Sequence, residues 1–89
     1  METGKVKVIN EVGLHARPAA LFVAKAASFK SDIRIHNATK AGKWVSAKSI
    51  LGVLTLGVEK DHEIEITAEG EDEVEAVRQI IALIENDFE

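Results

Sequence analysis

Apolar residues change their spacing several times along this chain, and these changes constrain its fold more than any other feature. Spacing at every second residue predicts half-buried strands, and spacing at every third or fourth residue predicts amphipathic helices. Strands are expected over residues 5–9, 32–37, 43–47 and 63–68, and helices over residues 16–28, 49–54 and 72–87. The order β-α-β-β-α-β-α predicts an α+β fold, with a four-stranded antiparallel sheet covered on one face by three helices.

The first helix has a marked start. Pro18, the only proline, fits only in the first turn of a helix, where its missing N–H group would lack a partner anyway. Because proline disfavours helical backbone at the residue before it, the first turn is expected to be irregular at Arg17. The expected apolar faces are Ala20, Val23, Ala24 and Ala27 on this helix, and Val74, Val77, Ile81 and Ile84 on the last one.

Composition narrows the class of protein. The 89 residues predict one domain over residues 1–89, and the absence of cysteine excludes disulfides and thiolate metal sites. A net charge of −4 argues against a nucleic-acid partner, which requires a basic face. No stretch approaches the ~20 apolar residues of a membrane span, and the first residues do not resemble a leader. We therefore expect a cytoplasmic protein with no membrane insertion.

A histidine that directly precedes a helix has particular chemistry. The first N–H groups of a helix lack partners and carry partial positive charge, which disfavours a charged imidazolium at His15. A neutral imidazole has a nucleophilic lone pair. A phosphoryl group on His15 would lie beside the backbone N–H groups of Ala16 and Arg17, and the Arg17 guanidinium would add a charge-assisted contact. A single histidine near a helix start is more often a surface residue or a cap, so this argument alone does not single out phosphoryl transfer.

Three segments carry a family resemblance. Gly-Leu-His-Ala-Arg-Pro-Ala at residues 13–19 closely resembles the active-site motif of HPr, the histidine-containing phosphocarrier of the bacterial phosphoenolpyruvate:sugar phosphotransferase system. Ser-Ala-Lys-Ser-Ile-Leu-Gly-Val-Leu-Thr-Leu-Gly at residues 46–57 resembles the second signature of that family, and residues 66–73 give a third match. Because length and element order also agree, the resemblance covers essentially the whole chain.

The resemblance implies an open-faced β-sandwich and a carrier that does not turn over alone, hence not an enzyme, with no cofactor and no metal. It implies that enzyme I phosphorylates His15 at Nδ1, that Arg17 assists, and that the phosphoryl group then passes to EIIA domains of sugar permeases. This role suits a small domain, because phosphoryl transfer needs positioning and charge stabilisation more than covalent machinery. A monomer is expected.

A second functional segment is expected at the short helix. Ser49 is a good N-cap residue, and it matches the family's regulatory serine, which an HPr kinase phosphorylates in some bacteria. Ile50 and Leu51, together with Ala20 and Val23, are expected to form an apolar docking patch near His15.

Two alternatives to the sugar carrier stay open. One is a regulator that contacts a transcription factor or an enzyme through Ser49, and the other is a carrier of the nitrogen-related branch of the same system.

Some positions depart from the family pattern or carry no function. The hairpin at residues 37–43 is longer than usual, Trp44 is unusual at its place, and Val12 stands where many members have a polar residue. A zinc site made of His15, His36 and His62 is conceivable, but no two of these histidines are four residues apart and no carboxylate is placed as a partner. We therefore expect no metal site.

Overall fold

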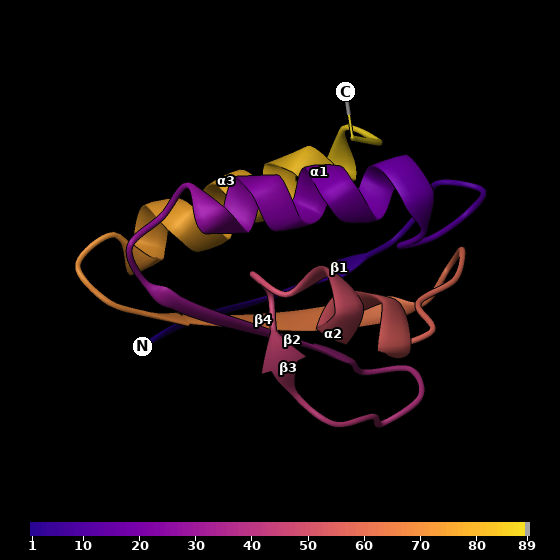
Figure 1. Cartoon of the computed structure of the whole chain (residues 1–89), viewed down its shortest axis with the longest axis horizontal. Helices are drawn as coiled ribbons and strands as arrows, with labels where there is room; N and C mark the ends of the chain where they lie inside the picture. The colour runs from indigo at the N-terminus through magenta and orange to yellow at the C-terminus, as the bar shows by residue number, and fades with distance from the viewer. Residues whose placement is uncertain (89) are drawn as a thin grey trace.

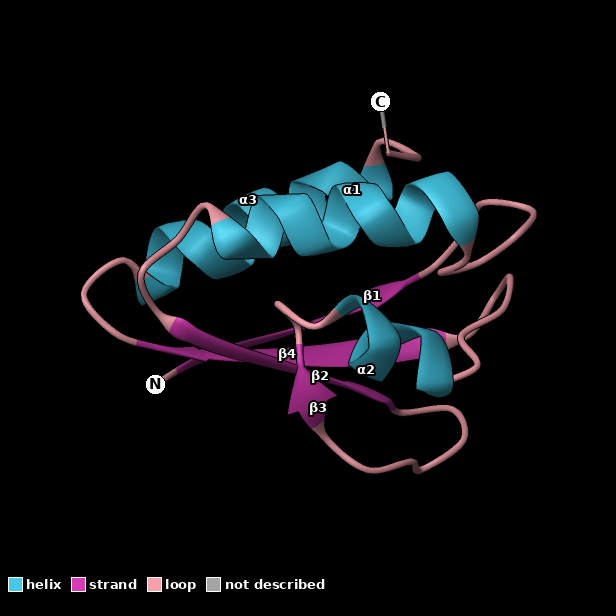
Figure 2. Ribbon diagram, in the orientation of Figure 1, coloured by secondary structure: helices cyan, strands magenta, loops and turns pink. Residues whose placement is uncertain are grey.

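The structure is a computed structural model that describes residues 1–88, and its elements follow the predicted order (Figures 1 and 2). The confirmed α+β architecture places α1 and α3 side by side over one face of the sheet, with α2 packed against α1. No helix of residues 1–88 is long and apolar enough to cross a membrane. The elements are β1 (Glu2–Lys7), α1 (Ala16–Ala27), β2 (Asp32–Asn37), β3 (Val45–Ser46), α2 (Ile50–Thr55), β4 (Glu63–Glu69) and α3 (Glu73–Glu85).

The four strands form one antiparallel sheet in the order β1-β4-β2-β3. β4 lies between β1 and β2, so that Ile66 is opposite Gly4 on one side and Ile35 on the other. This register places the inward side chains of the three long strands in one layer beneath the helices. The layer contains Val6, Ile33, Ile35, Ile64, Ile66 and Ala68, all buried.

The first and third strands differ from the prediction. β1 begins at Glu2 instead of residue 5, because its partner β4 is long enough to pair with it from Ala68 to Glu63. The apolar alternation is broken at Gly4, where α3 lies so close that a Cβ atom would come within 2.5 Å of Ile81 Cδ1. β3 comprises two residues, Val45–Ser46, instead of the five that were predicted.

The buried faces of the long helices also differ in part from the prediction. In α1 the buried residues are Ala19, Phe22 and Ala26, whereas Ala20, Ala24 and Ala27 are exposed. The sequence of α1 is rich in alanine all round, and alanine gives little indication of which face is buried. In α3, Val77 and Ile84 are buried as expected and Ile80 is buried with them, but Ile81 is half-buried and Val74 is 61% exposed.

The unusual Trp44 covers part of the sheet face that the helices leave open. Its ring stacks on His36 with a centroid separation of 4.3 Å and an interplanar angle of 23°. The His36 ring also lies 3.0 Å through Nδ1 from the Gly42 carbonyl and 3.4 Å through Nε2 from a Glu65 carboxylate oxygen. Trp44 and His36 therefore hold the hairpin at residues 37–43 against the sheet. Residues 1–88 contain no group of three potential metal-ligating side chains.

Candidate functional site

His15 is the N-cap residue of α1, as predicted. Its backbone is extended, with φ −130° and ψ 157°, and its side chain makes no capping hydrogen bond. The residue is exposed. The imidazole is therefore accessible to a partner and is not used to stabilise the helix that it precedes.

The first turn of α1 is irregular, but at Ala16 instead of Arg17. Ala16 has a φ of +51°, in the left-handed region that disfavours residues with a Cβ atom. The first two positions of α1 carry the backbone N–H groups of Ala16 and Arg17, and Pro18 at the third position has none. These two N–H groups are the donors that the sequence predicted for an anion beside His15.

The loop that delivers His15 to this position is clamped at several points. The Asn10 side chain donates from Nδ2 to the Gly13 carbonyl at 2.8 Å. The backbone carbonyl of Asn10 accepts a hydrogen bond from the Gly13 N–H at 3.3 Å. Gly13 has a φ of +65° and packs directly on the backbone of residues 58 and 59. Leu14 is buried and donates its N–H to the Val58 carbonyl at 3.1 Å. These contacts fix the chain immediately before His15.

A shallow hollow lies beside His15. His15 shares it with Glu11, Val12, Glu59 and Lys60. Lys60 Nζ donates to Glu11 Oε1 at 3.0 Å, and this carboxylate raises the pKa of Lys60 through the hydrogen bond and its charge. Val12 is 54% exposed. The hollow thus offers an apolar side chain and charges of both signs next to the imidazole.

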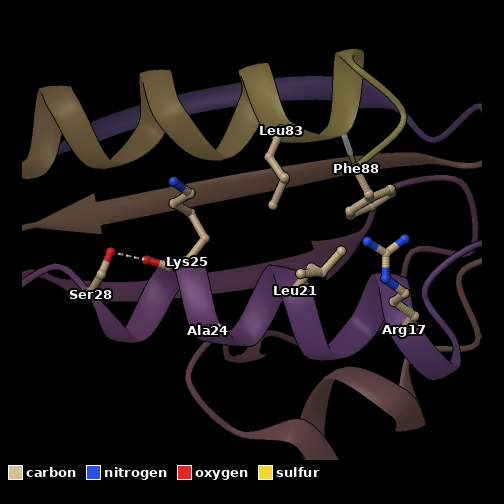
Figure 3. A pocket seen from close by; sticks show the side chains of 7 residues that line it. All are labelled: Arg17, Leu21, Ala24, Lys25, Ser28, Leu83 and Phe88. Carbon is tan, nitrogen blue, oxygen red and sulfur yellow. Dashed lines mark hydrogen bonds between the residues drawn. The ribbon is translucent and has the colours of Figure 1, made fainter.

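The Arg17 side chain lies elsewhere. It lines a second hollow, between α1 and α3, where Figure 3 shows its guanidinium pointing toward Phe88. Leu21 and Leu83 lie in this hollow, and Lys25 lies toward its other end (Figure 3). His15 is not among the residues that line it. The structure therefore brings together His15 and the Arg17 backbone, but it directs the Arg17 side chain to the α1–α3 side.

The short helix α2 agrees with its prediction. Ser49 is the N-cap, and its Oγ accepts a hydrogen bond from the Gly52 N–H at 3.1 Å. Ile50 is 42% exposed and Leu51 is 74% exposed, while Val53 is buried on the opposite side. The exposed apolar residues of the predicted docking patch are Ile50, Leu51 and Ala20, and Val23 is half-buried.

Sequence reasoning missed the contributions of Asn10, Lys60 and the backbone at residues 58 and 59. The residue types at 10–13 are typical of a turn, but nothing in them indicates which segment the turn packs against. Lys60 is remote from His15 along the chain, and one lysine in a polar turn has no distinguishing pattern. The turn before β4 lies beside the His15 loop because of contacts between residues far apart in the sequence, such as that of Leu14 with Val58.

An exposed histidine at the start of a helix, on an α+β scaffold with an open sheet face, has the features expected of a phosphoryl carrier domain. The family model for the PTS HPr component phosphorylation site matches residues 2–86. The chain therefore belongs to the HPr family, the phosphocarriers of the phosphotransferase system.

Two curated relatives and one solved structure illustrate the similarity. The chain is 45% identical over 83 residues to the HPr-like protein Crh of Bacillus subtilis, covering 93% of this chain and 94% of Crh. It is 43% identical over 84 residues to the multiphosphoryl transfer protein of Vibrio cholerae, covering 94% of this chain but 21% of that protein. A crystal structure of HPr from Thermoanaerobacter tengcongensis is 44% identical, with a TM-score of 0.93 and coverage of 99% of this chain and 96% of that one.

Some of these relatives have also been solved as dimers. The HPr of Thermoanaerobacter tengcongensis has a dimeric crystal structure with a TM-score of 0.77 to this chain, and Crh has a domain-swapped dimeric one with a TM-score of 0.74. The expected monomeric state of this chain therefore stays a prediction.

Proposed function

We propose that this chain accepts a phosphoryl group on His15 from enzyme I and donates it to EIIA components of sugar permeases. The observation that carries the proposal is the N-cap position of His15, whose exposed side chain makes no capping hydrogen bond. The ring is free to react, and the N–H groups of Ala16 and Arg17 lie at the adjacent helix end.

The transfer needs few groups. A lone pair on a His15 ring nitrogen, Nδ1 by the family resemblance, forms a bond to phosphorus while the donor's nitrogen–phosphorus bond breaks, and the donor nitrogen keeps that electron pair. The proton of the neutral imidazole stays on the other ring nitrogen. The helix N–H groups stabilise the anionic oxygens, and Arg17 adds its guanidinium when its side chain turns from the α1–α3 hollow.

Incubation with enzyme I and phosphoenolpyruvate tests this proposal. The wild-type chain should gain one acid-labile phosphate, His15→Ala should gain none, and His36→Ala should be labelled like the wild type. His36 is a suitable control because it lies on β2, on the open sheet face. Stable labelling of His15→Ala, or no labelling of the wild type, would contradict the proposal.

Regulation through Ser49 is a second proposal. A phosphate at this N-cap would face the start of α2, where negative charge is favourable, so the domain should stay folded. It would add charge beside the exposed side chains of Ile50 and Leu51, which we propose as part of the partner-docking surface with Ala20 and Val23. An HPr kinase would supply the phosphate, and a transcriptional regulator would be a partner of the modified form.

The alternative in which the chain acts mainly as a regulator makes a different prediction. A partner would bind the Ser49-phosphorylated form alone, and no phosphoryl group would leave His15. The nitrogen-related branch would instead preserve the chemistry at His15 and change the acceptor, so transfer assays with EIIA components of each branch would separate the two carriers. The cytoplasmic location stays a prediction.

A further inference from the structure

The cation that shares a hollow with His15 is not the one that the sequence pointed to. Among residues 1–88, the hollow beside the imidazole is lined by one cationic side chain, that of Lys60. Arg17 lines the separate α1–α3 hollow with Leu83 and Phe88 (Figure 3). An anion on His15 that faces this hollow would therefore share it with the Lys60 ammonium.

The backbone around Lys60 is held in place beside the His15 loop. Asp61 donates its N–H to the Val8 carbonyl at 2.7 Å, and His62 donates to the Glu59 carbonyl at 3.1 Å. The His62 ring also accepts the Glu59 N–H through Nδ1 at 3.1 Å. One residue earlier, the Val58 carbonyl accepts the Leu14 N–H, which ties this turn to the chain just before His15.

The Lys60 side chain is bound loosely in comparison. It reaches Glu11 Oε1 at 3.0 Å, but the two side chains are 46% and 85% exposed. Exposed ion pairs of this kind contribute little to stability, so a stronger anion can displace the carboxylate. A phosphoryl group carries more negative charge than a carboxylate and three acceptor oxygens.

We propose that Lys60 is a second phosphoryl-binding side chain, which exchanges its contact with Glu11 for the phosphoryl oxygens when His15 is modified. This inference rests on His15 as the phosphoryl acceptor. The flexible stem of lysine allows its ammonium to follow the group, and Glu11 keeps it near the hollow while His15 is unmodified. Phospho-His15 is then held from the helix side by N–H groups and from the loop side by Lys60.

Chemical phosphorylation tests the role of Lys60 without any partner protein. With phosphoramidate, the phosphorus–nitrogen bond of the reagent breaks, a bond to His15 forms, and ammonia leaves. The ³¹P NMR signal of phospho-His15 is identified by its loss in His15→Ala and is then followed against pH. A cation beside the phosphoryl group favours its more negative form, so the titration midpoint of Lys60→Gln should lie on the order of half a pH unit above that of the wild type.

Three further variants serve as controls. Lys60→Arg should restore the wild-type midpoint, and Glu11→Gln, which frees Lys60, should leave it unchanged or lower it. Lys30→Gln removes an exposed, ion-paired lysine beyond the other end of α1 and should behave like the wild type. The inference is overturned if Lys60→Gln titrates like Lys30→Gln, or if His15 takes no phosphoryl group. If enzyme I fails to label a chain whose chemically phosphorylated form shows the Lys60 shift, the proposed function fails and this inference stands.

Discussion

At the scale of single residues, the site depends on Gly13 as much as on His15. Gly13 has a positive φ, and it packs on the backbone of Val58 and Glu59. The residue after it, Leu14, is buried and hydrogen-bonded to the same segment. The two residues together therefore determine the position of His15. A left-handed backbone and a close approach are both requirements that glycine meets without strain.

Gly13→Ala should therefore damage both stability and function. A Cβ atom there would lie 2.7 Å from Glu59 Cα and overlap the Val58 carbonyl, in a backbone conformation that is itself unfavourable. We expect a loss of about 2 kcal/mol or more in the free energy of unfolding, measured with urea, and slower labelling by enzyme I. Gly42→Ala is the matched control, because nothing lies within 4 Å of its added Cβ atom. Equal urea midpoints for the two variants would contradict this explanation.

At the scale of elements, α2 presents an unusual distribution of apolar side chains. One side buries Val53, and Ser49 caps the start, while Ile50 and Leu51 face solvent. A helix of six residues cannot bury all its apolar side chains, even though α2 contacts both α1 and β3. The exposed pair lies on a helix that packs against α1, the helix that His15 begins.

Leu51→Ala tests whether this exposure serves a partner. Leu51 is 74% exposed, so the truncation should change the free energy of unfolding by less than about 0.5 kcal/mol. If Leu51 is an anchor of the docking surface, the KM for this chain in labelling by enzyme I should rise roughly fivefold or more. Val74→Ala, which truncates a 61% exposed side chain on α3, should change neither quantity. An unchanged KM for Leu51→Ala would remove Leu51 from the docking surface.

At the scale of the whole molecule, the sequence predicted the order of elements, the helix start at His15 and the Ser49 cap, because each depends on local chemistry. It placed β1 three residues late, since Gly4 lacks a side chain for a reason that only its contact with α3 supplies. The prediction of the buried face of α1 was wrong, because burial of its alanines is decided by what α1 packs against. The cationic side chain of Lys60 beside His15 could not be predicted, since it depends on how the ends of the sheet and the loops meet.

Asp72 connects the layers of the molecule and should make its stability depend on pH. Its carboxylate accepts hydrogen bonds from the backbone N–H groups of Lys30 at 2.8 Å and Ser31 at 3.0 Å, and from the Ser31 hydroxyl. It thereby joins the start of α3 to the segment between α1 and β2. These bonds, that of the Ser31 hydroxyl foremost, lower the pKa of Asp72 below its ordinary value of 3.8.

Because the folded pKa of Asp72 is depressed, the unfolded chain binds a proton at Asp72 more readily than the folded chain does. The resulting stabilisation is fully present above the ordinary pKa and is lost as the pH falls through the folded value. Asp72→Asn should therefore lower the urea midpoint at pH 7, and its difference from the wild type should shrink as the pH falls below 3.8. Glu71→Gln, which removes an exposed ion pair with Lys30, should have little effect at either pH. A difference between Asp72→Asn and the wild type that stays constant down to acid pH would show that the Asp72 charge does not hold the two segments together.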